Sequence, residues 1–166
     1  MKEERIVSFG LKSDSLPFFL AQFMAFEEKK IIIISHYITQ FNLTRVDLES
    51  KEVEDSQTSF FDLISKLTRS GIKITIYTTK GYAEKLIKSN DFKFKRGNLE
   101  MRVADNLHEK FVITSFFFYK GSANITYSGL YNKIENCEIG LVKDNQQYLN
   151  KVVYELEGQS KLFDIS

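Results

Sequence analysis

A run of four consecutive isoleucines constrains the fold of this chain more than any other feature. Residues 31–34 are all Ile, and they lie within the segment KKIIIISHYIT. β-Branched side chains favour strands, and an unbroken apolar run is typical of a strand that is covered on both faces. We therefore predict a buried strand that ends near Ser35 and His36.

The rest of the chain alternates between segments of helical and of strand periodicity. Between residues 99 and 119 the pattern predicts two strands around a turn at Asp105 and Asn106, and residues 42–57 are expected to form an exposed acidic loop. The predicted helices cover residues 14–28, 60–67, 81–90, 128–133 and 145–159, and the further strands cover 72–80, 99–104, 108–119 and 137–142. This alternation indicates an α/β fold, a mixed β-sheet flanked by helices on both faces.

Length and composition favour a single globular domain over residues 1–166. No Pro/Gly/Ser-rich linker divides the chain, and one Cys excludes an internal disulfide and a multi-Cys zinc site. The net charge of +1 means that any anion-binding surface must come from local arrangement. Since no apolar run could span a bilayer and the first residues lack a signal-peptide pattern, we expect a cytoplasmic protein without membrane segments.

Residues with phosphate-binding chemistry occur in order over 108–124. His108 and Lys110 are two apart, so on a strand they share one face, where their positive charges repel unless an anion binds between them. Ser122 and Asn124 follow that strand, where polar side chains and free backbone N–H groups can hold phosphate oxygens. Taken alone, the His–Lys pair fits a surface pair on a strand edge as well, and Ser122 fits a turn residue.

Asn136 and Glu138 are the third polar pair. They too are two apart on a predicted strand. A carboxylate near His108 would fix the imidazole tautomer and raise its basicity. The alternatives are a solvated strand-end acid for Glu138 and a turn residue for Asn136.

The segment HEKFVITSFFFYKGSANITYSGLYNKIENCEIGLV resembles the phospholipase D superfamily. The shared signature is His-x-Lys, then Gly-Ser-x-Asn, then Asn-x-Glu on the next strand. The motif match runs from His108 to Glu138, and the order of strands and helices over nearly the whole chain is similar to one unit of that fold.

The resemblance implies a role for each motif residue. His108 would be the nucleophile that attacks phosphorus and forms a phosphohistidine. Lys110 and Asn124 would bind the nonbridging phosphate oxygens, with Ser122 assisting, and Glu138 would hydrogen-bond the imidazole. Asn136, the first residue of the Asn-x-Glu motif, would shape the site.

The resemblance also implies a homodimer. The family's reaction uses two His-x-Lys motifs, one for the nucleophile and one for the general acid, whereas this chain has one. Short members of the superfamily bring two copies together at one shared site, and most of them are nucleases that need no metal or other cofactor. Sequence specificity would then come from a partner subunit or a larger assembly, as in restriction or phage-defence systems.

One position departs from the family pattern. Superfamily members usually carry Asp five residues after the Lys, and this chain has Ser115 there. Ser115 is an odd number of residues from His108, so we expect it to face away from the site. We therefore interpret the family's Asp as a structural hydrogen-bonding residue, and we expect its absence here to affect activity only modestly.

Two further residues near the motifs are weaker candidates for the site. His36, at the end of the isoleucine strand, is a candidate to line the site because strand carboxyl ends border ligand crevices. A packed structural histidine is the alternative. Cys137 lies between Asn136 and Glu138, so it should point the other way and act as a small core residue.

A basic stretch at residues 80–96 is a candidate nucleic-acid surface. It holds six basic and two acidic residues, with Tyr82, Phe92 and Phe94 interleaved, and Lys93, Lys95 and Arg96 cluster at its end. Charges for phosphates and rings for bases are what a nucleic-acid groove uses. A solvated helix face followed by a hairpin fits the same pattern.

Three functions are compatible with these motifs. The first is a metal-independent nuclease or phosphodiesterase acting on DNA or RNA, and the second is a non-catalytic nucleic-acid-binding or assembly module of the same fold. The third is a phospholipid hydrolase. It is the least favoured, because the chain has no Trp and no amphipathic basic helix that would bind a membrane surface.

Overall fold

The computed structural model describes residues 24, 27, 29–39, 42–43, 58–90, 92–108, 110–122, 124–125 and 137–165. The helices expected at 14–28 (Met24 and Glu27 apart) and at 128–133 lie outside these residues, as does Asn136. Most of the expected acidic loop, residues 44–57, lies outside them too.

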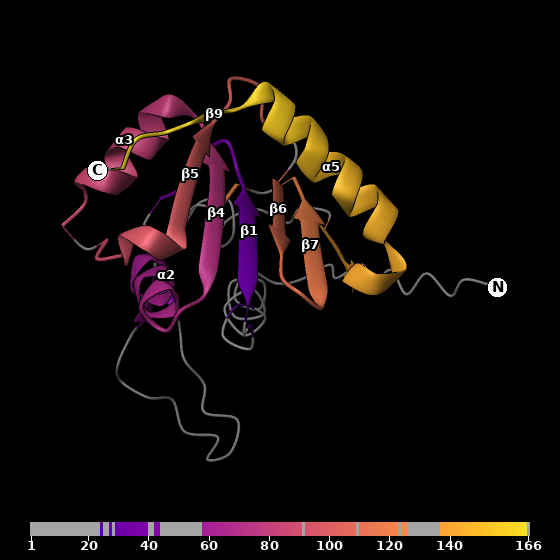
Figure 1. Ribbon diagram of the computed structural model, residues 1–166, viewed down its shortest axis with the longest axis horizontal. Helices are drawn as coiled ribbons and strands as arrows, with labels where there is room; N and C mark the ends of the chain where they lie inside the picture. The colour runs from indigo at the N-terminus through magenta and orange to yellow at the C-terminus, as the bar shows by residue number, and fades with distance from the viewer. Residues whose placement is uncertain are drawn as a thin grey trace, which may run out of the picture.

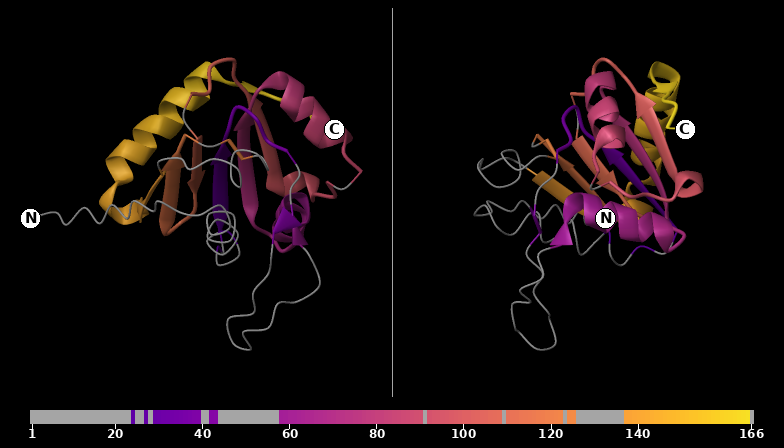
Figure 2. Two further views of the ribbon diagram at one scale, coloured as in Figure 1. Left: turned by 180° about the vertical axis from the view of Figure 1, so that it is seen from behind. Right: turned by 90° about the vertical axis from the view of Figure 1, so that its left-hand side faces the viewer.

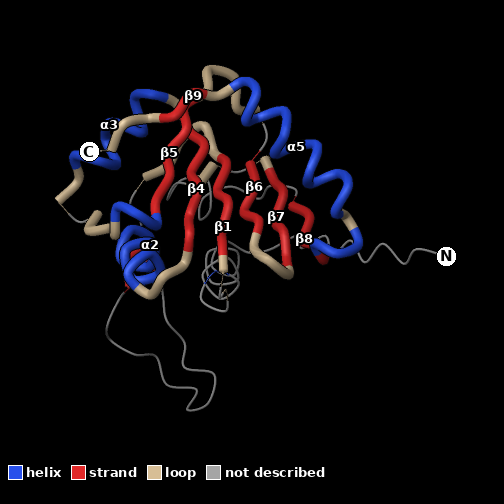
Figure 3. Tube along the Cα trace, in the orientation of Figure 1, coloured by secondary structure: helices blue, strands red, loops and turns tan. Residues whose placement is uncertain are grey.

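A seven-stranded mixed sheet organises the chain, with the strands in the order β8-β7-β6-β1-β4-β5-β9. β1, β4 and β5 are parallel, and every other neighbouring pair in this sheet is antiparallel. Figure 3 labels the strands in their order across the sheet. The strands are β1 (Lys30–Ile34), β4 (Lys73–Thr78), β5 (Leu99–Val103), β6 (Lys110–Ile113), β7 (Phe117–Gly121), β8 (Cys137–Leu141) and β9 (Lys161–Leu162). A second, two-stranded sheet pairs β2 (Asn42–Leu43) with β3 (Thr58–Ser59).

Helices cover both faces of the large sheet (Figures 1 and 2). α2 (Phe60–Arg69) and α3 (Lys80–Lys88) pack on one face, and α5 (Gln146–Gln159) packs on the other. Two short 3₁₀ turns, Arg96–Asn98 and Val142–Asp144, precede β5 and α5. The predicted α/β fold with helices on both faces is confirmed.

The four isoleucines explain why β1 lies inside the sheet. Ile31 and Ile33 are fully buried in the cluster beneath α2 and α3, whereas Ile32 and Ile34 face the cluster beneath α5. Alternate side chains of one strand thus fill both cores, as a strand covered on two faces requires. β1 runs from 30 to 34, which matches the predicted strand.

The prediction of one strand over residues 108–119 is wrong, whereas the strand expected at 99–104 is observed as β5. The expected strand at 108–119 is two antiparallel strands, β6 and β7, because a turn follows Thr114. The hydroxyl of Thr114 accepts hydrogen bonds from the amides of Phe116 and Phe117 (3.3 and 3.0 Å), which stabilises this turn. β5 and β6 are not neighbours in the sheet, because β4 and β1 lie between them.

Within the described part of the chain, no helix is long and apolar enough to cross a membrane.

Candidate functional site

Five motif residues lie at the same end of the large sheet, which we call the upper edge. The parallel strands β1, β4 and β5 end at this edge, which is the upper one in Figure 1. β6 and β8 begin there and β7 ends there, because these strands are antiparallel to their neighbours. His108, Lys110, Ser122, Asn124 and Glu138 are therefore gathered by topology, although they are up to 30 residues apart in the chain.

Lys110 is held at the first position of β6. Its ammonium donates a hydrogen bond to the carbonyl of His108 (2.8 Å), and its side chain is half-buried. His108 itself precedes the strand and is exposed. Within the described residues, no hydrogen bond reaches its imidazole, so both ring nitrogens are open to a ligand or to another chain.

Asn124 is fixed by the end of β1. Its side-chain oxygen accepts a hydrogen bond from the amide of Tyr37 (3.4 Å) and lies 3.4 Å from the hydroxyl of Ser35. That hydroxyl donates to the carbonyl of Tyr37 (2.7 Å) and accepts from the amide of Ile125 (3.0 Å). With its oxygen turned inward, Asn124 keeps two amide N–H donors free of partners among the described residues, which suits an anion's oxygens.

The glycine of the Gly-Ser-x-Asn motif is required by packing. Gly121 pairs with Lys110 across β6 and β7. A Cβ at position 121 would overlap the hydroxyl and ring of the buried Tyr119. Glycine therefore lets Tyr119 pack under the strand end that presents Ser122, which is exposed.

Glu138 is placed by its register on β8. It pairs with Lys120 on β7, so it faces the α5 side of the sheet, whereas Lys110 faces the α2 and α3 side. β8 lies two strands from β6, roughly 10 Å away at the usual strand spacing. Among the described residues, no hydrogen bond or ion pair joins Glu138 to His108.

A small cavity of about 210 Å³ lies beside His108. Ile34 and Phe111 of the sheet line it together with Glu155 and Leu156 of α5. His108 thus borders the α5 side of the edge. We expected His108 and Lys110 to share one face of a strand. The alternation of side chains along β6 does not apply to His108, because β6 begins at Lys110.

His36 lies at the same edge, directly after β1. Its carbonyl accepts hydrogen bonds from the hydroxyls of Thr78 and Thr79 (3.2 Å each), which tie the end of β1 to the start of α3. Its ring meets the ring of Tyr37 edge-on, with centroids 4.2 Å apart. Tyr37 was not among the residues predicted for the site, although its position directly after a buried strand could have pointed to it.

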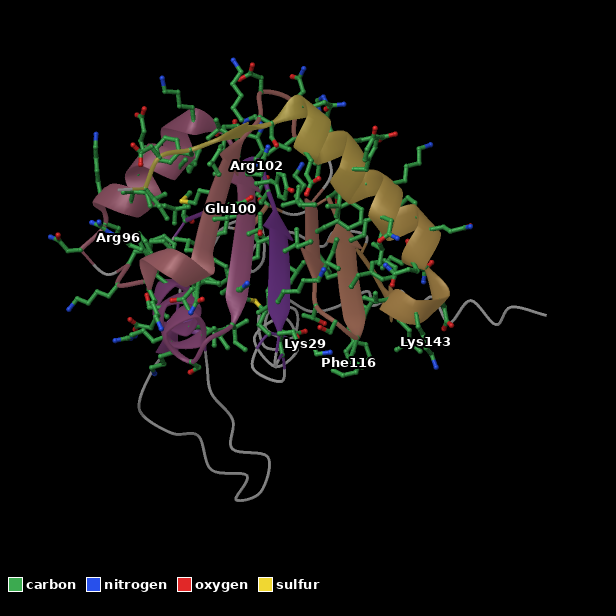
Figure 4. All side chains as sticks on the ribbon, in the orientation of Figure 1. Lys29, Arg96, Glu100, Arg102, Phe116 and Lys143 are labelled. Atoms are coloured by element: carbon green, nitrogen blue, oxygen red, sulfur yellow. The ribbon has the colours of Figure 1, made fainter. Side chains whose placement is uncertain are left out.

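The basic stretch divides into two parts. Lys80 and Lys85 lie on α3, which begins at the edge where the motif residues gather. Lys93, Lys95 and Arg96 are exposed but precede β5, so they lie towards the opposite end of the sheet. Figure 4 labels Arg96. The hydroxyls of Ser65 and Thr68 accept from the amides of Lys93 and Lys95 (3.0 Å each), which fixes this segment on α2.

Two of the three interleaved rings are not available to bases. Phe92 is 5% exposed and packs between Phe61 and Phe94 in the core under α2. Phe94 is partly buried against the same core. Of the rings in this stretch, Tyr82 at the start of α3 is the one near the motif residues.

Ser115 lies at the opposite end of the sheet from the motif residues, in the turn between β6 and β7. This is the end where Figure 4 labels Lys29 and Phe116. The amide and hydroxyl of Ser115 both donate to the buried carboxylate of Glu27, the hydroxyl at 2.8 Å. The amide of Lys29 also donates to it (2.7 Å). Ser115, at the sequence position where the family pattern has Asp, is thus hydrogen-bonded to a carboxylate from a distant part of the chain.

The pKa of Glu27 reflects these contacts. Burial of the carboxyl opposes ionisation and would raise the pKa. The hydrogen bonds from Ser115, Lys29 and Lys30 outweigh burial and lower the pKa below its ordinary value of 4.5.

Comparison with known proteins gives structural neighbours but no relatives by sequence. No protein-family model matches the chain, and no curated protein sequence matches it. Among solved structures, NucT from Helicobacter pylori shares 13% identity at a TM-score of 0.60, over 95% of this chain and 97% of that one. Nuc from Salmonella typhimurium, a phospholipase D family member, shares 10% identity at a TM-score of 0.58, over 87% and 88%.

A DNA-binding protein is a further neighbour. TrmBL2, an archaeal chromatin protein with a novel mode of DNA binding, shares 16% identity at a TM-score of 0.63. The match covers 98% of this chain and 54% of TrmBL2, so the chain spans about half the length of that protein. Together these neighbours establish that the chain has a phospholipase D-like fold, as its motifs predicted.

Proposed function

We propose that the chain is a metal-independent phosphodiesterase that cleaves DNA or RNA, and that it acts as a homodimer with one shared site. The observation that carries this proposal is the convergence of His108, Lys110 and Asn124 at one sheet edge. Phosphoryl transfer through a phosphohistidine requires an imidazole that is open to attack phosphorus, together with positive charge and N–H donors for the phosphate oxygens.

The proposed reaction has two steps. In the first, an imidazole nitrogen of His108 attacks phosphorus, the bond to the leaving oxygen breaks, and the second copy's imidazolium protonates that oxygen. In the second, water attacks phosphorus, gives its proton to the second copy's imidazole, and the N–P bond breaks. Lys110 and Asn124 stabilise the charge on the nonbridging oxygens throughout, with Ser122 beside them. Glu138, Asn136 and His36 are proposed to border this site.

A non-catalytic nucleic-acid-binding module is the second candidate. It is favoured by the similarity to TrmBL2, which extends over 98% of this chain. The two candidates share the binding edge and differ in whether His108 becomes phosphorylated.

Labelled single- and double-stranded DNA and RNA incubated with the protein in excess chelator will separate the candidates. Cleavage is expected, together with an acid-labile phosphate on His108 in quenched reactions, identified by mass spectrometry. His108→Ala should abolish both. His36→Ala removes the other histidine of the chain and should keep the covalent adduct. Binding without cleavage by the wild-type protein would favour the module, and cleavage by repurified His108→Ala at the wild-type rate would reject the site.

A further inference from the structure

A cluster of three aromatic rings, those of His36, Tyr37 and Tyr82, lies beside Asn124 and has no part in the motif chemistry. The ring of Tyr37 lies between His36 and Tyr82, with centroid distances of 4.2 and 4.9 Å. The ammonium of Lys85 lies 4.7 Å from the centre of the Tyr82 ring. The aromatic cluster therefore links the end of β1 to the basic first turns of α3.

Tyr37 is the most exposed member of this cluster. It is 43% exposed and meets the His36 ring edge-on and the Tyr82 ring at a tilt, whereas Tyr82 is half-buried and carries Lys85 over its ring. The hydroxyls of Thr78 and Thr79 donate hydrogen bonds to the carbonyl of His36, the residue before Tyr37. A large ring that is held in place and still open to solvent is suited to stacking with a ligand ring.

The position of Tyr37 connects the ring to the phosphate site. The backbone N–H of Tyr37 donates to the side-chain oxygen of Asn124 (3.4 Å). The residue that carries the ring is therefore in direct contact with the side chain that is proposed to bind phosphate. The Lys85 ammonium adds a positive charge at the Tyr82 side of the cluster. Rings for bases alternating with charges for phosphates form the surface that single-stranded nucleic acids bind.

We infer that Tyr37, positioned by Tyr82, stacks an unpaired base next to the phosphate bound at Asn124, so that the substrate is single-stranded nucleic acid. This inference rests on the proposed function. Bases of a duplex are already paired and stacked, and extruding one costs a few kcal/mol. Tyr37 therefore favours a strand whose bases are free, and stacking applies to DNA and RNA alike.

Binding measurements on His108→Ala protein, which cannot turn over the probe, test the inference. The probes are an oligothymidylate, an oligouridylate, a duplex, and an oligonucleotide backbone of abasic residues. Adding Tyr37→Ala should weaken binding of both single strands roughly 5- to 150-fold, the range for losing one stacked base. Affinity for the duplex and the abasic backbone should not change, because neither offers a base to the ring. Comparing the two single strands shows which sugar is preferred.

Three controls keep the result interpretable. Tyr37→Phe keeps the ring and should bind like the parent, and Tyr37→Leu keeps apolar volume and should bind like Tyr37→Ala. Tyr154→Ala removes a 78% exposed tyrosine from α5 and should change nothing. Unchanged binding of single strands by Tyr37→Ala, or an equal loss on the abasic backbone, overturns the inference while the proposed function stands. Failure of the parent protein to bind any probe overturns both.

Discussion

Replacing Ser115 with the Asp that the family pattern usually has should destabilise this protein. The Ser115 hydroxyl donates to the Glu27 carboxylate at 2.8 Å. An Asp side chain at position 115 would place a second carboxylate beside that of Glu27, which is 5% exposed. Ser115→Asp therefore exchanges a hydrogen bond for a repulsion between like charges.

The size of the effect follows from the distance. Two unit charges about 4 Å apart repel by about 4 kcal/mol at an effective dielectric constant of 20. Protonating one carboxyl at pH 7 instead costs a similar amount, about 1.4 kcal/mol for each pH unit above its ordinary pKa of roughly 4. We expect Ser115→Asp to lower the free energy of unfolding by about 4 kcal/mol at pH 7. For a chain of this length that corresponds to a fall in Tm of roughly 8–16 °C.

Urea denaturation of four proteins measures the effect: wild type, Ser115→Asp, Glu27→Gln and the double variant. The raised pKa of one carboxyl in Ser115→Asp means that its penalty shrinks as the pH falls, to roughly 1–2 kcal/mol at pH 5. The double variant should be more stable than Ser115→Asp at pH 7, because the amide introduced at position 27 does not repel the new carboxylate and can donate a hydrogen bond to it.

Two results would contradict this reasoning. One is a Ser115→Asp protein as stable as wild type at pH 7, and the other is a double variant less stable than Ser115→Asp. Cleavage activity per folded molecule should stay at the wild-type level in Ser115→Asp, since the residue lies at the end of the sheet opposite His108.

Three further predictions concern Glu27, α3 and Gly121. Because the folded-state pKa of Glu27 is lowered, its contribution to stability is present above about pH 4.5 and is lost as the pH falls through the folded pKa. When the free energy of unfolding is measured against pH, Glu27→Gln should lack this part of the decrease at acid pH. Replacing Lys80 and Lys85 with Ala should flatten the salt dependence of single-strand binding by roughly 0.7 per lost phosphate contact, whereas alanines at Lys93, Lys95 and Arg96 should leave it unchanged. Gly121→Ala should lower stability by about 1–3 kcal/mol in thermal unfolding, because Tyr119 must shift to admit the methyl group.

The layers of the fold could be predicted because local pattern determines them. The isoleucine run required a strand covered on both faces, and the apolar spacing of residues 60–67 predicted a helix that is observed as α2. Strand boundaries within 108–119 could not be predicted in the same way. A continuous apolar run concealed the turn after Thr114, and Phe116 and Phe117 of that run are 61% and 37% exposed.

Residues of the candidate site could be predicted where a motif marks them and not where tertiary contacts create them. His108, Lys110 and Asn124 were predicted from spacing, and topology brings them to one edge. Glu27 is 88 residues from Ser115, and no local pattern connects the two. The position of Tyr37 beside Asn124 likewise depends on a contact between β1 and the segment after β7.

Mixing active and inactive chains distinguishes a shared site from one complete in each chain. A shared site needs His108 from both copies, so a dimer with one His108→Ala chain lacks either the nucleophile or the general acid. After equal amounts of wild-type and His108→Ala protein exchange subunits freely, about one quarter of the dimers are fully wild-type, and activity per amount of total protein should fall to about one quarter of the value for wild type alone. If His36 acted as the acid within each chain, half of the activity would remain. Light scattering on the same samples should give roughly twice the chain mass of 19.3 kDa. Monomers that cleave at the full rate would overturn the shared site and leave His36 as the proton donor to examine next.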